Sequence, residues 1–365
     1  MDILYIKRTF DRYCESIADY NVITESYCGL VKGDMGLILC NGYFYKLFNE
    51  YKYFNEIQVL TKKIFNRSYN NYSLGYGLAG LAWTVELLKQ AELLECNRKW
   101  VEKIDILLAK EGQKQILNGH LDYFSGGAGI LNYFLCKQVK EDVVFDLACL
   151  YINEISKKII SQTKNFNLGV PHGLIGDILL LIKLKVLLQF QVESLIGEIV
   201  DILWKSRNPI GSISILPYFQ NDKKETTLAW CYGDLPFMYC LIKMKVCNIP
   251  FDYPKELEFV FEQTLNRTDC YRDNNTLCHG SIVVALLYHQ MWKITGIEKY
   301  FLISEDWKRY SYEVWNRCYL DLKKKDKNVD YYSDSSLFNG PSGFFLSMFS
   351  MENINFMNWE QCLII

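Results

Sequence analysis

The sequence predicts an all-α protein in which helical hairpins repeat seven times and close into an α/α toroid. A short glycine pattern recurs seven times, an apolar run of helical length follows each occurrence, and the composition suits a large core. Half of the 365 residues are hydrophobic, 15% are aromatic and only seven are proline. Such a composition argues against intrinsic disorder.

The repeat consists of a glycine, usually a second glycine three residues later, and then an apolar segment. It reads GDMG from Gly33, GLAG from Gly77, GGAG from Gly126, GLIG from Gly173, GDLP from Gly233, GSIV from Gly280 and GPSG from Gly340. Successive first glycines lie 44 to 60 residues apart. This interval holds two helices and their connections, so each repeat is predicted to be a helical hairpin. The fifth and sixth repeats lack the second glycine, a difference that local repacking can absorb.

The third repeat shows how the two helices of a hairpin differ. The segment after Gly126 is almost wholly apolar, whereas residues 144–159 place apolar side chains at helical spacing opposite charged ones. One helix is therefore predicted to be buried and the other half-buried. We expect seven inner helices surrounded by seven outer helices, with glycines at the inner-helix starts allowing close backbone approach. An open solenoid of hairpins is the structural alternative.

The two longest repeats contain polar insertions, NDKKETT in residues 221–227 and LKKKDKNVDYYSDSS in residues 322–336. Both are predicted to be loops over the rim of the ring. We interpret the lysine run at residues 323–325 as a solvated face. Since no linker divides the chain, residues 1–365 are expected to form one domain.

Charge and cysteine content narrow the class of protein. A formal net charge of −2 provides no broad basic field, so nucleic acid is not an expected partner. The thirteen cysteines lack a framework spacing and the N-terminus lacks a long apolar signal core, which together favour a reducing cytoplasm. The longest apolar runs are interrupted by charges or too short to cross a bilayer, so stable membrane insertion is not expected.

Chemically active side chains occur just before the repeat glycines. His172 and His279 each directly precede a first glycine, while Cys231 and Cys278 stand two residues before one. Asp122 lies four residues before Gly126. If the repeats are structurally equivalent, these five side chains lie at the same end of the inner helices and converge on one rim or cavity.

Two cysteines and a histidine form a donor set that zinc prefers. Cys231, Cys278 and His279 would leave the fourth tetrahedral position open, as in catalytic zinc sites. The alternative is that both cysteines are small buried hydrophobes. In a purely structural interpretation of this kind, His172 is a helix-end histidine and Asp122 is an N-cap.

The other two histidines and two aromatic residues near WCYG are less informative. His120 has no aligned glycine and His289 lies within an apolar run, so both are predicted to be structural. Trp230 and Tyr232 can line the cavity, although aromatic residues in such segments more often belong to the core.

The motifs WCYG, CHG, PHG and DYFSGGAG on a sevenfold glycine frame resemble the lanthionine cyclase family, the LanC-like proteins of lanthipeptide biosynthesis. The similarity extends from about Gly33 to Gly343. It implies an α/α toroid whose zinc is held by Cys231, Cys278 and His279. It also implies an acid/base role for His172 and a catalytic carboxylate at Asp122.

By the same resemblance, the reaction expected is addition of a peptide cysteine thiol to a dehydroalanine or dehydrobutyrine, giving lanthionine or methyllanthionine. His172 would protonate the α-carbon. Asp122 would accept the thiol proton or orient His172, and the sequence leaves both roles open. The implied partners are a dehydrated precursor peptide with its leader, a dehydratase and an exporter.

One departure leaves a second class of function open. The best-characterised cyclases carry an arginine shortly before WCYG, whereas this chain has ETTLA there, with Thr227 four residues before Cys231. Neither Lys223 nor Lys224 can be assumed to replace it. The alternatives are a zinc-containing scaffold that binds peptide or glutathione without catalysis, and a toroid resembling protein prenyltransferases. The latter expects an aspartate among the metal ligands and a basic pocket for diphosphate, and neither is evident.

Overall fold

The computed structural model describes residues 3–18, 27–137, 142–161, 165–252, 254–270, 275–322 and 334–365. In these ranges the chain is helical, and the extended backbone is limited to one isolated bridge between Asn167 and Phe219. The inner helices are α2 (Met35–Phe48), α4 (Leu78–Gln90), α6 (Gly127–Cys136), α8 (Leu174–Leu188), α10 (Asp234–Val246), α12 (Ser281–Thr295) and α15 (Ser342–Met351). The outer helices are α1 (Ile3–Ala18), α3 (Tyr51–Phe65), α5 (Arg98–Leu117), α7 (Asp142–Ser161), α9 (Glu193–Lys205), α11 (Glu256–Leu265) and α13 (Glu298–Leu322).

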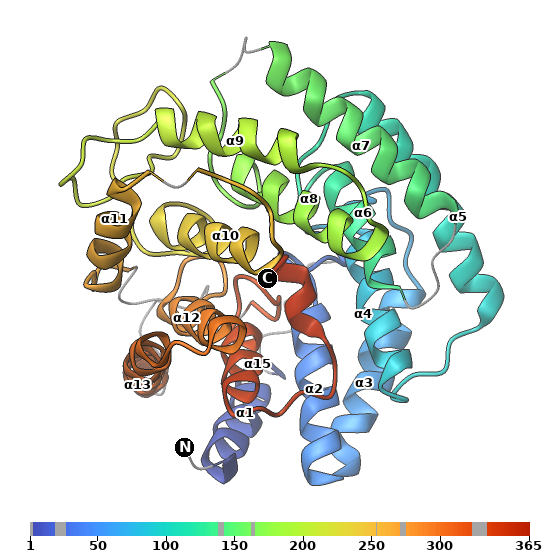
Figure 1. Ribbon diagram of the computed structural model, residues 1–365. Coiled ribbons are helices and arrows are strands. Elements are labelled where there is room, and N and C mark those ends of the chain that lie inside the picture. The colour runs from blue at the N-terminus through green and yellow to red at the C-terminus, as the bar shows by residue number, and fades with distance from the viewer. Residues whose placement is uncertain are drawn as a thin grey trace.

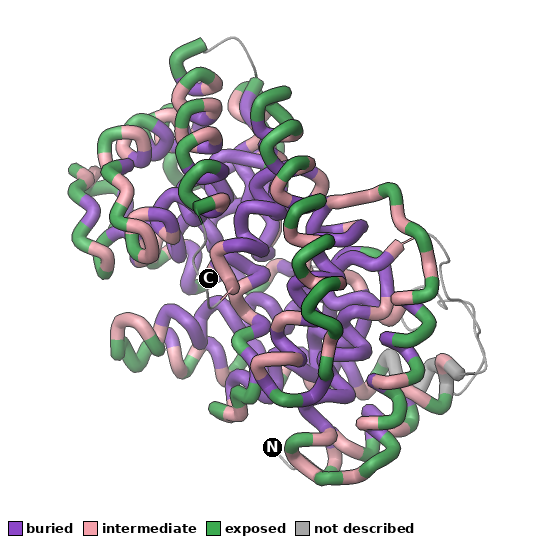
Figure 2. Tube along the Cα trace, turned by 90° about the vertical axis from the view of Figure 1, so that its right-hand side faces the viewer, coloured by how far each residue is buried: buried purple, intermediate pink, exposed green. Residues whose placement is uncertain are grey.

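The inner helices form a closed ring. Each one contacts the next, from α2 through α4, α6, α8, α10 and α12 to α15, and α15 packs back against α2. The first ten or so residues of each inner helix are buried, as their apolar sequences require. The ring and its outer layer are visible in Figure 1, and Figure 2 shows buried chain inside and exposed chain outside. This arrangement confirms the predicted α/α toroid and eliminates an open solenoid.

The outer helices are half-buried, and their apolar stripes face the ring. In α7, Val144, Tyr151 and Ile155 are buried while Asp146 is exposed, as the spacing in the sequence predicts. The first outer helix covers the joint between the last and first repeats. Phe10 of α1 stacks on Phe44 of α2 at 4.1 Å. The N-terminal helix thus helps to close the ring.

The short segments before the inner helices form a second ring, made of backbone hydrogen bonds. Each segment donates an N–H to a carbonyl of the next one. The bonds run from Val31 to Gly75 (2.7 Å), Gly75 to Phe124 (2.8 Å), Tyr123 to Pro171 (2.9 Å), Val170 to Cys231 (2.8 Å), Cys231 to Cys278 (3.3 Å), Leu277 to Phe338 (3.1 Å) and Phe338 to Leu30 (3.1 Å). Residues two or three positions before each repeat glycine are therefore equivalent in space, as the repeat predicted.

The repeat glycines permit close backbone contact at this hydrogen-bonded ring. A Cβ atom on Gly77 would lie 2.1 Å from the Asn71 carbonyl oxygen, and one on Gly173 would lie 2.2 Å from that of Asn167. Real side chains do not approach that closely, so a larger residue would push the inner helix away from its preceding turn. These contacts support the predicted role of both glycines.

The C-terminal segment fills the centre of the ring, where Figure 1 places the end of the chain. It contains the short 3₁₀ helix η1 (Trp359–Leu363). The Leu363 carbonyl accepts a hydrogen bond from the Trp230 indole at 3.0 Å, and that of Cys362 accepts one from the Tyr123 hydroxyl at 2.8 Å. Trp230 therefore belongs to the core, and the site above it is closed from below.

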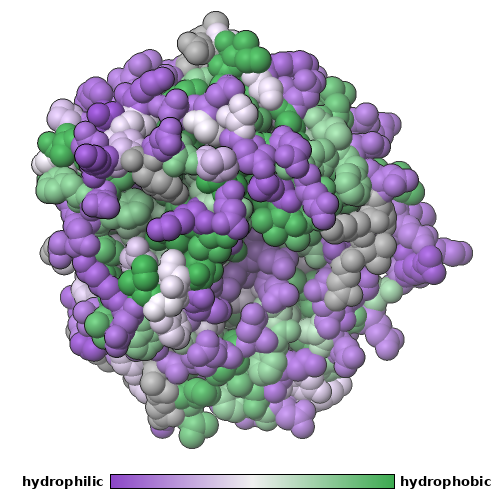
Figure 3. Space-filling view, viewed as in Figure 1, coloured by the Kyte–Doolittle hydropathy of each residue, from purple (hydrophilic) through white to green (hydrophobic). Residues whose placement is uncertain are grey.

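The surface is predominantly polar on the outer helices. On the face that Figure 3 presents, hydrophilic residues also line a hollow near the centre. Of the helices described, none combines the length and hydropathy that crossing a lipid bilayer would require. The lysine run at residues 323–325 lies outside the described residues.

Candidate metal centre and acid-base pair

The structure brings Cys231, Cys278 and His279 together at the rim of the ring. The two cysteine sulfurs and a ring nitrogen of His279 all lie within 4.8 Å of one another. Cys231 precedes α10, and Cys278 and His279 precede α12. Because α10 and α12 are neighbours in the ring, the adjacent repeats place the three side chains side by side.

The two thiols are electrostatically unequal. A hydrogen bond from Cys231, followed by a hydrogen bond and charge from His279, lowers the pKa of Cys278 to about 5 in spite of burial. The same hydrogen bond to Cys278, together with burial, raises the pKa of Cys231 well above its usual range. The pair therefore holds a thiolate on Cys278 and a proton on Cys231. Such a pair binds a soft cation by releasing that proton.

His172 and Asp122 form a second pair at the same rim. The His172 Nδ1 atom lies 2.5 Å from Asp122 Oδ2, and the Ser125 backbone N–H donates to Asp122 Oδ1 at 2.7 Å. The hydrogen bond to Asp122 raises the pKa of His172, with burial opposing it. Burial opposes ionisation of Asp122, but His172 and Ser125 offset it and lower the pKa of that carboxyl. The Asp122 carboxylate therefore keeps His172 protonated, as an imidazolium, up to a higher pH than a free histidine.

A cavity of about 330 Å³ is lined by both His172 and the two cysteines. It is lined by Pro171, His172, Tyr218, Thr227, Ala229, Cys231, Tyr232, Cys278 and His279. No lysine or arginine occurs among these described residues. Thr227, at the position where the resemblance expects an arginine, is on the wall. The Lys224 ammonium lies 5.8 Å from the centre of the Tyr218 ring and is not among the residues that line the cavity.

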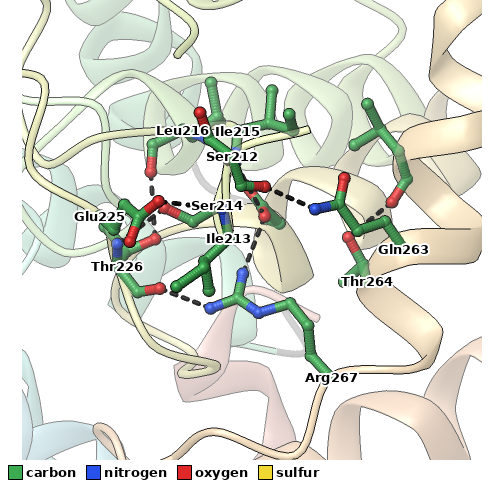
Figure 4. Close-up of polar contacts among 12 residues, drawn as sticks. Ser212, Ile213, Ser214, Ile215, Leu216, Glu225, Thr226, Gln263, Thr264 and Arg267 are labelled. Atoms are coloured by element: carbon green, nitrogen blue, oxygen red, sulfur yellow. Dashed lines mark hydrogen bonds and ion pairs between the residues drawn. The ribbon is translucent and has the colours of Figure 1, made fainter. Parts of the chain in front are cut away.

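A buried ion-pair network supports the wall that carries Thr227. The Arg267 guanidinium donates to Asp234 at 2.8 Å and to the Thr226 carbonyl, and Asp234 accepts N–H bonds from Ile215 and Leu216. Figure 4 shows Arg267 reaching from the segment after α11 to the segment around Thr226. Since Asp234 is the first residue of α10, this network ties the loop to the helix that follows Cys231.

A second cavity of about 490 Å³ also borders His172. Pro171 and His172 line both cavities, and Asp122, Lys157 and Asp177 line the second. Pro171 and His172 therefore form a wall that the two cavities share. The residues of α7 in its wall were not identified from the sequence, because their alternation looked like an ordinary outer helix.

The remaining histidines are placed apart from the candidate metal ligands. His120 is exposed, with Nε2 at 3.3 Å from the Ser125 hydroxyl, and it lines the second cavity. His289 is buried inside α12, and neither ring nitrogen has a hydrogen-bond partner in the described part of the chain. Tyr232 lines the first cavity, and its hydroxyl accepts a hydrogen bond from the Asn167 amide at 2.8 Å.

The donor set fits a zinc ion. Zinc held tetrahedrally at ~2.0–2.3 Å from sulfur and nitrogen separates its ligand atoms by roughly 3.5 Å. The ligand atoms of Cys231, Cys278 and His279 lie within 4.8 Å of one another, an upper limit somewhat wider than that spacing. Three protein ligands would leave a fourth coordination position for substrate, and all three residues line the cavity. Two thiolates and one imidazole also suit zinc better than magnesium or calcium.

Comparison with known proteins identifies relatives of the whole chain. The family described as "Lanthionine synthetase C-like protein" matches residues 26–364. A solved structure of "Nisin cyclase" superposes with a TM-score of 0.75 at 19% sequence identity, and the match covers 98% of each chain. No curated protein sequence matches the chain. The structural similarity supports the closed helical ring described above.

Proposed function

The chain belongs to the lanthionine synthetase C-like family, and from that premise we propose that it is a zinc-dependent lanthionine cyclase. Its substrate would be a precursor peptide that carries cysteine together with dehydroalanine or dehydrobutyrine. The observation that carries this proposal is a cavity lined by a zinc-type donor set and by His172, which is hydrogen-bonded to Asp122. Sulfur activation and proton delivery are the two requirements of the reaction.

Cys231, Cys278 and His279 would hold the metal. Zinc in this position supplies one function, lowering the pKa of the substrate thiol so that the thiolate predominates at neutral pH. Because both cysteine ligands are anionic, the donor set leaves little positive charge to weaken the nucleophile. The Arg267 network contributes indirectly by holding the loop that leads to Cys231.

His172 would complete the addition. The substrate sulfur forms a bond to the β-carbon, and the electron pair of the carbon–carbon double bond moves toward the α-carbon and the adjoining carbonyl. The His172 imidazolium then gives its proton to the α-carbon and becomes neutral. Asp122 favours the protonated imidazole before the step and holds the ring in one orientation throughout. The thiol proton released at the start restores the imidazolium, so the reaction is an isomerisation.

The proposal is tested with a peptide that contains one dehydro residue and one free cysteine. Because ring closure leaves the mass unchanged, a thiol-alkylating reagent is added before mass spectrometry, and only open peptide gains the alkyl group. His172→Asn should slow closure by about 10²–10⁴-fold, the usual contribution of a general acid or base, while the variant still binds zinc and peptide. The matched control is His120→Asn, which removes an exposed histidine nearby and should leave the rate unchanged.

Spontaneous addition of thiols to dehydro residues is subtracted from each rate. Equal rates for the wild-type protein and His172→Asn above that background would assign His172 a structural role. A wild-type protein that binds peptide or glutathione and zinc but never exceeds background would be a binding scaffold. Gain of isoprenoid mass by the peptide would instead place the chain with prenyltransferase-like toroids.

A further inference from the structure

The residue directly before each repeat glycine occupies a special place on the ring. His172, Tyr232 and His279 hold this position in the fourth, fifth and sixth repeats, and all three line the cavity beside the cysteines. The hydrogen-bonded ring makes the seven positions equivalent. The corresponding residues elsewhere are Lys32, Tyr76, Ser125 and Asn339. Each of the seven is exposed or half-buried, although the glycine that follows is buried.

Two of these side chains have no role in the proposed chemistry, and within the described residues no hydrogen bond of the side chain explains their presence. The Asn339 amide donates to the Val31 carbonyl at 3.1 Å, and Ser125 caps Asp122 through its backbone N–H. Lys32 and Tyr76 remain, in the first and second repeats. Their segments are directly joined, because the Lys32 N–H donates to the Gly75 carbonyl at 3.2 Å.

Lys32 and Tyr76 form a compact cluster with Tyr27. The Lys32 ammonium lies over the Tyr27 ring at 5.1 Å from its centre, and the Tyr27 and Tyr76 rings meet edge to face at 6.3 Å. Burial raises the pKa of Tyr76, and the charges of Asp122 and Cys278 raise it further, so its hydroxyl stays protonated. The hydrogen-bonded ring places Tyr76 at the position equivalent to His172, Tyr232 and His279, which line the cavity.

The cluster presents the Lys32 ammonium and the Tyr76 hydroxyl as hydrogen-bond donors, and the Lys32 charge also acts at longer range on the Asp334 carboxylate. Within the described residues, no carboxylate lies within 4.0 Å of the Lys32 ammonium, and no hydrogen bond engages the Tyr76 hydroxyl. An ammonium and a phenol that both pack against the Tyr27 ring are complementary to a carboxylate. Of the seven side chains, His172 is cationic but paired with Asp122 at 2.5 Å, whereas Lys32 is cationic and has no carboxylate within 4.0 Å among the described residues.

We propose that Lys32, Tyr76 and Tyr27 form a carboxylate-binding subsite that positions the substrate peptide across the rim from the metal ligands. The carboxylate would come from an acidic side chain near the reacting cysteine or from the peptide C-terminus. This inference rests on the proposed function for the identity of the ligand as a peptide. Lys32 and Tyr76 are positioning residues in this scheme, because they touch a part of the substrate that does not react.

The test measures binding rather than turnover. Four fluorescent peptides carry one cysteine, alanine in place of the dehydro residue, and either Asp or Asn beside the cysteine, each with a free or amidated C-terminus. Affinity for the zinc-loaded protein is measured by fluorescence anisotropy at low salt, where charge pairing is least screened. One charge-assisted hydrogen bond corresponds to a preference of roughly tenfold for the carboxylate. An Asp preference identifies a side chain as the source, and a free-acid preference identifies the C-terminus.

Lys32→Met should abolish the preference, and Tyr76→Phe should reduce it by a few-fold. Lys103→Met, which changes an exposed lysine on α5, is the matched control and should retain it. Circular dichroism melting verifies that the variants are folded. A wild-type protein without any carboxylate preference, or a preference that survives Lys32→Met, overturns the subsite. Ring-closure assays decide the proposed function separately, because a carboxylate preference without catalysis keeps the subsite and rejects the cyclase.

Discussion

Two pairs of neighbouring repeats share one backbone frame but carry different side chains. The fifth and sixth repeats have Cys231 and Cys278 two positions before the repeat glycine. The seventh and first repeats have Phe338 and Val31 at the same positions. The backbone hydrogen bond from Cys231 to Cys278 and the one from Phe338 to Leu30 are links of the same ring. The comparison shows that the frame can be kept while the chemistry varies. The individual side chains at equivalent positions of the ring therefore determine which chemistry each repeat can support.

The largest effect should come from removing one of the proposed zinc ligands of the fifth and sixth repeats. Cys231→Ala, Cys278→Ala and His279→Ala should each lower zinc affinity by more than about 100-fold, because each removes one of three protein ligands. Elemental analysis after desalting measures the content, which we expect to be about one zinc per wild-type chain. Asn339→Ala changes the position equivalent to His279 in the seventh repeat and should leave zinc content unchanged. Full zinc in all three ligand variants would reject the assignment.

The next effect tests the frame that both sides share. Gly77→Val in the second repeat and Gly173→Val in the fourth should each cost about 3 kcal/mol or more of unfolding free energy, because the added Cβ would lie 2.1 or 2.2 Å from a carbonyl oxygen. Gly197→Ala in α9 is the control, since nothing lies within 4 Å of its added Cβ, and helix propensity predicts a small gain. Thermal and urea denaturation measure all three. Unchanged melting of both valine variants would contradict the close-packed rim.

His289 and His172 provide a comparison with opposite signs. Burial without a hydrogen-bond partner lowers the pKa of His289 to about 4, whereas Asp122 raises that of His172. The unfolded chain protonates His289 near its ordinary value of 6.5, so the neutral folded state loses stability as pH falls from 6.5 toward 4. Between pH 7 and pH 5 this loss amounts to about 2 kcal/mol. His289→Leu should remove that part of the acid sensitivity in urea titrations, and an unchanged pH dependence would show that His289 is solvated.

The smallest expected change sharpens the role of Asp122. A raised pKa keeps His172 protonated as pH rises, so ring closure that needs the imidazolium should decline only above the raised value. Asp122→Asn removes the charge that favours protonation and should move this basic limb of the pH–rate profile to lower pH. Asp222→Asn, on an exposed loop, is the control. If the basic limb of the Asp122→Asn pH–rate profile does not move, the observed titration belongs to a group other than His172.

Much of the fold and the site follows from the sequence because both depend on local register. The glycine interval and the alternation of apolar and amphipathic segments predict the inner and outer helices. The offset from each repeat glycine predicts that Cys231, Cys278, His279 and His172 share one rim. Lys32 and Tyr76 hold the same offset as His172, and applying that rule to every repeat would have drawn attention to them.

Other features depend on contacts that no periodic pattern records. The Trp230 indole donates to a carbonyl 133 residues away, so its place in the core depends on where the C-terminal segment enters the ring. The Arg267–Asp234 pair joins the segment after α11 to the first residue of α10, 33 residues earlier in the chain. Likewise, the wall formed by Tyr218 and Thr227 comes from the long insertion of the fourth repeat. Three-dimensional packing determines these contacts, and the repeat pattern does not predict them.

The link between the seventh and first repeats has a consequence for how the chain reaches its native state. The Asn339 amide bonds to the Val31 carbonyl 308 residues earlier, and Phe338 bonds to Leu30 in the same joint. During synthesis the early hairpins can form and stack, but the joint cannot be made until the last repeat has left the ribosome. Until then both ends of the growing array expose an apolar face. An open array of hairpins tolerates loss of a terminal unit, whereas a closed one must complete its circle in a late, cooperative step of high contact order.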